Sequence, residues 1–301
     1  MTAVVEVPLS LDDRSFEQFA TGFAAIGDPG QRVLVDAHAT EWASPFGLVS
    51  LLCAGEALAE RLGTKPLLTV PSDKDVTSYW ARTGFFQEAD ALFEIHGAVP
   101  KVRQPPESNV LLEVTPVRVA GDVHKVVDRI QDRAAAILTS ELGLEARATM
   151  GFGMALSETC QNIVEHAGTG GWVAVHAYTW RRRLGRRVVV IAVGDAGVGF
   201  RQSLEPTQAR RFGDRWGDGT ALEAALIQGV SRFRDPGRGQ GFRGIRKYLD
   251  HWKGKITIRS GTARIAMIRP WDDDVPLREG LAPFPGAQLQ VVIPAAEQEA
   301  P

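Results

Sequence analysis

A carboxylate, an amide and an imidazole follow one another at helical spacing in the segment SETCQNIVEHAG, residues 157–168. On an α-helix Glu158, Asn162 and His166 are spaced i, i+4 and i+8, so they turn only about 80° around the axis and share one face. An amide oxygen can ligate a hard Mg²⁺ ion, and a carboxylate one turn away can orient or deprotonate a nucleophile. The same spacing is common on amphipathic helices with a solvated polar face, which is the favoured interpretation if the segment is taken alone.

Glycines surround a second carboxylate in VVVIAVGDAGVGF, residues 188–200. A continuous apolar strand leads to Asp195, and Gly197 and Gly199 follow, so a ligand can approach the backbone closely at the strand end. An ionised carboxylate there accepts hydrogen bonds, and the exocyclic amine of adenine is a suitable donor. An ordinary turn between a strand and a loop has the same composition, so this segment also has two interpretations.

A third glycine-rich segment, DPGRGQGFRGIRKYLD, spans residues 235–250. Gly237, Gly239 and Gly241 precede an expected helix, whose free N–H groups would converge on an anion such as a phosphate. The string from Gly239 to Gly244 also reads GxGxxG, but a dinucleotide site of that type needs a strand immediately before it. The preceding residues, RFRDPGR, are not a strand pattern, which argues against a Rossmann site.

The hydrophobic pattern indicates the elements that must position these residues. Residues 121–143 and 149–166 read as amphipathic helices, and residues 172–180 and 186–195 read as two strands of a hairpin. The polar stretch 201–238 predicts a mobile loop, or lid, with one short helix near 221–230. Further strands are expected at 111–119, 254–260, 263–269 and 288–294, and a further helix at 242–252.

A proline-rich break at residues 98–110 divides the chain, so we expect a domain at 1–100, a linker at 101–114, a second domain at 115–295 and a tail at 296–301. In the first part, strands at 32–37 and 65–70 flank a helix at 46–63 that ends in glycine. The first part is therefore α/β, with a small sheet covered by helices. The second is α+β, with an antiparallel-rich sheet and helices on one side.

Taken together and in order, the three segments resemble the GHKL ATPase family of gyrase, heat-shock chaperones, histidine kinases and mismatch-repair proteins. SETCQNIVEHAG resembles its N box, VGDAGVGF its first glycine box and GRGQGF its second. The resemblance implies a Bergerat-type two-layer α/β sandwich that binds ATP and Mg²⁺, with Glu158 as the general base and Asn162 as the metal ligand. It places His166 where the anti-sigma-factor serine kinases of the family carry a histidine, and Asp195 at the adenine. The other implied cofactor-binding residues are Gly197, Gly199, Gly237, Gly239, Gly241 and Phe242.

The first part resembles a STAS-type domain, the phosphorylatable partner fold of those anti-sigma kinases, in the stretch VLVDAHATEWASPFGLVSLL. A phosphorylatable STAS domain has Asp-Ser-Ser-Gly before its helix, whereas this chain has Ser44, Pro45, Phe46 and Gly47. Phe46 occupies the acceptor position. We therefore expect a docking or sensing module and not a phosphorylation substrate.

The composition limits the choice of partners and compartment. The 34 basic and 36 acidic residues give a net charge of -2, which disfavours binding to nucleic acid or anionic lipid. The two cysteines, far apart in apolar segments, indicate a reducing compartment. No apolar run approaches the roughly 18 residues that cross a bilayer, and the N-terminus has no leader pattern. We expect a cytoplasmic protein that does not contact a membrane.

These observations predict a regulatory protein that binds Mg-ATP and a protein partner, and that could form a homodimer. In one form Glu158 activates a serine hydroxyl of the partner, and in the other it activates water. The alternative from another class is a catalytically idle switch whose lid closes on the nucleotide and changes partner affinity.

Overall fold

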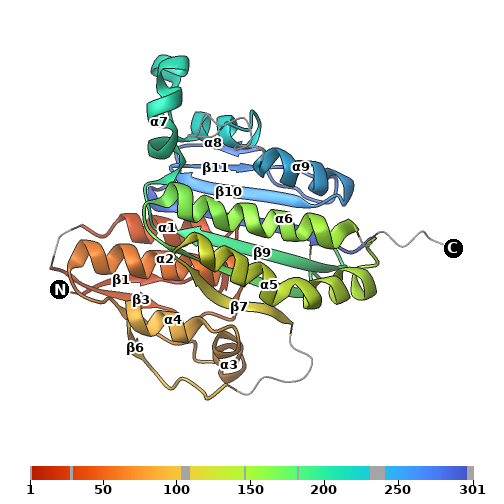
Figure 1. Cartoon of the computed structure of the whole chain (residues 1–301). Coiled ribbons are helices and arrows are strands. Elements are labelled where there is room, and N and C mark those ends of the chain that lie inside the picture. Colours follow the sequence, from red (N-terminus) through yellow and green to blue (C-terminus); the bar gives the residue numbers. More distant parts are fainter. Residues whose placement is uncertain are drawn as a thin grey trace.

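The computed structural model describes residues 2–27, 30–102, 109–145, 147–181, 183–230 and 241–296, and of Asp132, His166 and Gly241 it describes only the backbone. The fold is mixed α/β, as expected, with two main sheets that belong to the two parts of the chain (Figure 1). No helix within these ranges is long and apolar enough to cross a membrane.

The N-terminal part contains a parallel sheet in the order β1-β3-β5-β6, and a short parallel pair, β2 and β4. The predicted strands at 32–37 and 65–70 and the helix at 46–63 are confirmed. Ser44 caps that helix by accepting from the backbone N–H of Gly47 at 3.1 Å, and Gly63, at φ 70°, ends it. The elements are β1 (Thr2–Glu6), β2 (Ser10–Leu11), α1 (Phe16–Ala24), β3 (Arg32–Asp36), β4 (Trp42–Ala43), α2 (Pro45–Leu62), β5 (Leu67–Thr69), α3 (Lys74–Arg82), α4 (Phe85–Leu92) and β6 (Glu94–His96).

The C-terminal part is built on an antiparallel sheet in the order β12-β11-β10-β13-β9-β8-β7. The predicted hairpin is present, because β8 and β9 pair from Gly171 opposite Asp195 to Thr179 opposite Arg187. The first strand begins at Val110, inside the range expected as linker. The strands are β7 (Val110–Val117), β8 (Gly171–Thr179), β9 (Arg187–Asp195), β10 (Lys255–Gly261), β11 (Ala263–Ala266), β12 (Leu277–Arg278) and β13 (Phe284–Pro294).

Helices cover one face of this sheet, and two of them end in a π-helical turn. Their apolar side chains form one core with the sheet residues that point the same way. The elements are α5 (Ala120–Ala136) with the turn η1 (Ile137–Glu141), α6 (Arg147–Asn162) with the turn η2 (Ile163–Ala167), and α9 (Gly241–His251). The helices expected at 121–143, 149–166 and 242–252 are therefore present.

The expected lid is largely helical where the structure describes it. The one short helix predicted near 221–230 is present, whereas the loop predicted before it was wrong. It contains α7 (Gly199–Phe212), the 3₁₀ turn η3 (Gly213–Arg215) and α8 (Asp218–Leu226). Figure 1 shows α7 projecting beyond the body of the molecule. Of its residues only Ser203 and Leu204 are buried, so its sequence lacks the apolar stripe by which a packed helix is recognised. The rest of the predicted lid, 231–238, lies outside the described residues.

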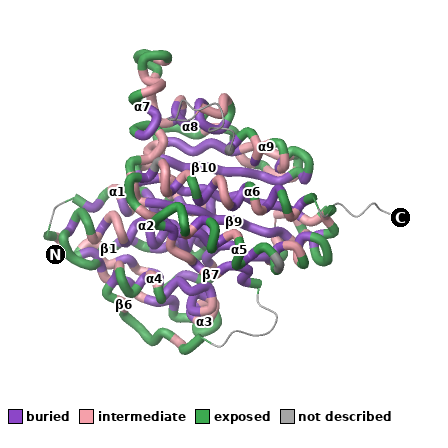
Figure 2. The backbone as a smooth tube through the Cα atoms, viewed as in Figure 1, coloured by how far each residue is buried: buried purple, intermediate pink, exposed green. Residues whose placement is uncertain are grey.

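Nearly all residues of β8, β9 and β10 are buried (Figure 2), so both faces of the sheet are covered along these strands. Along β9, Val189, Ile191 and Val193 join the core under α5, α6 and α9, whereas Ala192 joins the core of the N-terminal part. The alternation follows from the pleat of a strand, which sends successive side chains to opposite faces. It explains why this strand is apolar throughout.

The face toward the N-terminal part nevertheless carries polar side chains that are almost completely buried. Several of them have partners across the interface between the two parts. Lys255 Nζ lies 3.9 Å from Asp13 Oδ2, and the Tyr79 hydroxyl lies 3.0 Å from His176 Nδ1. The buried polar residues of this face include His176, Lys255, Thr257, Arg259, Gln288 and Gln290.

Candidate functional site

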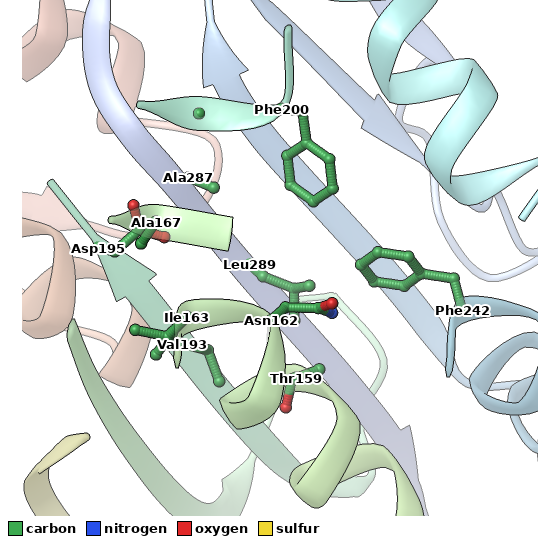
Figure 3. Close-up of a pocket in the computed structure, with 11 residues that line it drawn as sticks. Thr159, Asn162, Ile163, Ala167, Val193, Asp195, Phe200, Phe242, Ala287 and Leu289 are labelled. Atoms are coloured by element: carbon green, nitrogen blue, oxygen red, sulfur yellow. The ribbon is translucent and has the colours of Figure 1, made fainter. Parts of the chain in front are cut away.

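A pocket opens between α6, the end of β9, β13 and the first residues of α7 and α9 (Figure 3). Its empty space is about 430 Å³ when the open solvent at its mouth is counted. Most of its wall is apolar, and the rings of Phe200 and Phe242 lie with their centroids 6.0 Å apart. The lining residues are Thr159, Asn162, Ile163, Ala167, Val193, Asp195, Gly199, Phe200, Phe242, Ala287 and Leu289. An apolar cavity with a few placed polar groups is the usual form of a small-molecule site.

Among the lining residues that the structure describes, Asp195 is the one that is acidic, and it is the last residue of β9. Its side chain is almost fully buried, and its Oδ1 accepts the backbone N–H of Gly197 at 2.9 Å. Burial raises the pKa of Asp195 to about 7, although backbone hydrogen bonds from Gly197 and Ala287 act in the opposite direction. A carboxyl group with a strongly raised pKa in a pocket is a candidate functional group.

Two glycines allow the backbone to close around Asp195. A Cβ atom at Gly197 would lie 2.0 Å from the carbonyl oxygen of Ala167, so only glycine lets this loop approach the end of η2. Gly286, at φ +67°, faces Asp195 so closely that a Cβ would lie 2.0 Å from its carbonyl oxygen. The N–H of Val198 also donates to Ala167 at 3.0 Å. The loop that carries Asp195 is thereby joined to the helix that carries Asn162.

Asn162 lies in the pocket wall, whereas Glu158, one turn earlier on α6, is not among the lining residues. Glu158 is half-buried, and burial, together with the charge of Glu165, raises its pKa. Thr159 faces the pocket, but its hydroxyl donates to the Ala155 carbonyl at 2.8 Å, as buried helix hydroxyls often do. Of the polar side chains predicted on this helix, the structure thus brings Asn162 together with Asp195.

The second glycine segment is described only in part. Gly241 begins α9, and Phe242 beside it lies in the pocket wall. Gly199 lies in the wall as well. Gly237 and Gly239 fall outside the described residues, as does the side chain of His166, whose backbone belongs to the turn η2.

Sequence reasoning missed the contribution of β13. Gly286 closes the corner at Asp195, and Ala287 and Leu289 form part of the wall. A strand was expected from 288, but nothing in its sequence showed that it pairs with β9, far away along the chain. The alternation of Ala287, Leu289 and Val291 was the available signal for a buried face.

The fold and the site define a mixed α/β protein with an apolar pocket and a buried carboxylate at one end. No protein-family model matches the chain, and none of the curated proteins is similar to it at a significant level.

Proposed function

We propose that the chain binds ATP together with Mg²⁺ in this pocket. The observation that carries the proposal is Asp195, a buried acceptor at the end of a largely apolar cavity. The faces of adenine are apolar and its exocyclic amine is a hydrogen-bond donor, so a purine with an amine at this place satisfies both the wall and the carboxylate. Guanine presents an oxygen at the same place, so that two hydrogen-bond acceptors would face each other.

The opposite end of the site suits the charged part of the nucleotide. The Asn162 side chain offers an amide oxygen, and Mg²⁺ in proteins is commonly held by one or two side-chain oxygens together with phosphate oxygens. The first turn of α9 begins at Gly241, beside the pocket residue Phe242, and the free N–H groups of such a turn favour an anion. Bound Mg²⁺ would neutralise charge on the phosphates.

Glu158 is the proposed general base, acting on water or on a serine hydroxyl of a partner protein. Its half-buried position supports this role, because a carboxyl with a raised pKa is a better base near neutral pH. The alternative is a catalytically idle, nucleotide-dependent switch that binds a partner or a second copy. One observation favours this alternative, since Glu158 lies outside the described wall of the pocket.

The observed architecture supports both family resemblances. A seven-stranded antiparallel sheet with α5, α6 and α9 on one face is the two-layer arrangement expected of a GHKL domain. The smaller sheet with helices fits a STAS-like docking module. An intracellular regulator that acts on a protein partner follows from this combination by analogy.

Titration calorimetry with ATP and GTP, with and without Mg²⁺, tests the binding proposal. We expect ATP to bind and GTP to bind at least about tenfold more weakly, because guanine loses a hydrogen bond to a charged group. Equal affinities would contradict the role of Asp195. Incubation with γ-labelled ATP, alone and with lysate, then separates hydrolysis, transfer to protein and no turnover.

A further inference from the structure

The strand that carries Asp195 is supported from behind by the N-terminal part. Val193 and Asp195 of β9 point into the pocket, and Gly194 between them points to the other face of the sheet. There it meets α2: a Cβ atom at Gly194 would lie 2.8 Å from Val49 Cγ1 and 3.0 Å from Cys53 Sγ. Real Cβ contacts are rarely so short, so α2 packs directly on the backbone one residue from the candidate adenine contact.

A second contact reaches the same corner from β13. Phe284, the first residue of that strand, is buried and packs with ring centroids 4.9 Å from Phe16 and 4.7 Å from Phe23, both in α1. Two residues later Gly286 closes on Asp195. The N-terminal part therefore holds both strand ends that form the corner, β9 through α2 and β13 through α1.

Charged groups extend the contact beside α2. Glu56, one turn after Cys53, pairs with Arg118 at 3.3 Å, and the guanidinium of Arg118 lies 4.6 Å from the ring centroid of Trp172 on the neighbouring strand β8. The pKa of Asp195 is raised mainly by burial, and the charge of Glu56 adds to the effect. Both packing and electrostatics thus link α2 to the pocket.

We propose that Val49 and Cys53 of α2 are positioning residues for Asp195, so that docking of the N-terminal part and nucleotide binding are coupled. The inference rests on the proposed nucleotide function. Coupling between two equilibria is reciprocal: if docking strengthens ATP binding, ATP strengthens docking by the same factor. A partner that draws α2 away from β9 would lower the affinity for the nucleotide without touching the pocket.

A pair of complementary substitutions tests the proposal. Gly194→Ala adds a methyl group that α2 has no room for, and Val49→Ala removes the nearer of the two side chains that it would strike. We expect each single variant to raise the Kd for Mg-ATP about 3- to 30-fold, the range of effects seen for residues that couple distant sites. The double variant should recover most of the affinity, because the new methyl fills the space left by Val49.

Val35→Ala is the matched control. Val35 is equally buried in the N-terminal core, but it lies on β3, within the parallel sheet. It should lower the melting temperature about as much as Val49→Ala and leave the Kd unchanged. If Gly194→Ala does not fold, the Kd values of Val49→Ala and Val35→Ala are enough to test the positioning role.

The outcomes separate this inference from the function on which it rests. Unchanged ATP affinity in Gly194→Ala and Val49→Ala, or equal losses in Val49→Ala and Val35→Ala, would overturn the positioning role and leave ATP binding in place. Failure of the unmodified protein to bind ATP would overturn both.

Discussion

Arg259 and Glu17, 242 positions apart in the sequence, form a two-pronged ion pair between the two parts of the chain. Nε of Arg259 on β10 lies 3.0 Å from one carboxylate oxygen of Glu17 on α1, and Nη2 lies 3.2 Å from the other. The guanidinium is completely buried, and its Cζ lies over the rings of Phe16 and Phe284, 5.3 and 5.4 Å from their centroids. Such parallel hydrogen bonds are among the strongest that an arginine makes.

Glu17→Ala is expected to destabilise the fold by about 3–5 kcal/mol, because it leaves a buried charge without its partner. Urea denaturation measures the effect. Glu94→Ala is the control, since the pair of Arg32 and Glu94 is exposed and 3.7 Å apart, and it should cost less than about 1 kcal/mol. Equal free energies of unfolding in the two variants would show that Glu17 is not needed to stabilise the buried charge of Arg259.

Asp195→Asn should lower the affinity for ATP at least about tenfold, because the carboxylate acceptor becomes an amide and a charged hydrogen bond is worth about 1.5–3 kcal/mol. Calorimetry checks the result. Asp73→Asn is a suitable control, since Asp73 caps α3, where asparagine caps equally well. An Asp195→Asn variant that binds ATP normally would remove Asp195 from the site.

Binding of the adenine base should depend on pH, because the pKa of Asp195 is raised by burial to about 7. Only the ionised carboxylate is the proposed acceptor, so the affinity for adenosine should rise from pH 6 to 8 and then level off. Adenosine is the probe because its binding involves no phosphate titration. Calorimetry in buffers of different ionisation enthalpy should show proton release near pH 7, and Asp195→Asn should abolish it.

The raised pKa of Asp195 has the opposite effect on the stability of the fold, which should fall as the pH rises. The folded-state pKa lies above the ordinary value of 3.8, so the folded form binds the proton more tightly than the unfolded form. The contribution of Asp195 to stability therefore decreases as pH rises from about 4 to about 7 and is constant above that. If the affinity of the unmodified protein for adenosine did not change between pH 6 and 8, the proposed titration of Asp195 would be wrong.

Substitutions of Glu158 and Asn162 should impair different steps, turnover in the first case and binding of Mg-ATP in the second. Glu158→Gln keeps the shape of the side chain and removes the base, so Mg-ATP should still bind while turnover falls about 10²- to 10⁴-fold. Asn162→Ala should weaken binding of Mg-ATP and affect Mg-free nucleotide much less, because the proposed contact of Asn162 is with the ion. Phosphate release and calorimetry measure the two effects. Normal turnover in both variants would mean that this helix face is merely polar.

Ser44 should not be a phosphorylation site. It is almost completely buried, its oxygen caps α2, and Phe46 beside it is buried as well. Incubation with γ-labelled ATP followed by peptide mapping should find no label at Ser44. Ser44→Ala should leave any labelling unchanged and destabilise the protein by about 1 kcal/mol through loss of the cap. Label at Ser44 would show that the start of α2 opens to the active site of another molecule.

The sequence predicted most elements of the C-terminal part, because their apolar patterns are pronounced. The helix with Asn162 and the strand that ends at Asp195 were both expected, and they meet in one pocket. The pattern failed for α7, which buries only two residues and contains Pro206, so neither periodicity nor propensity indicated a helix.

The contact between the two parts could not be predicted from the sequence either, and the physical reason differs from that for α7. Thr257 and Arg259 alternate with Ile256 and Ile258 along β10, a pattern that normally places polar side chains in water. Here these polar residues are buried, and the charge of Arg259 is neutralised by Glu17 on α1. The compensation comes from far away in the sequence and has no local signature.

The position of β13 also has a consequence for how the chain folds during synthesis. This strand is the last in the described sequence, yet it lies between β10 and β9 in the middle of the sheet. The sheet cannot close before residue 294 has left the ribosome, whereas the N-terminal part emerges first with its α1 and α2 surfaces uncovered. Pairings between such distant segments form slowly, so nascent chains should depend on chaperones until β13 inserts.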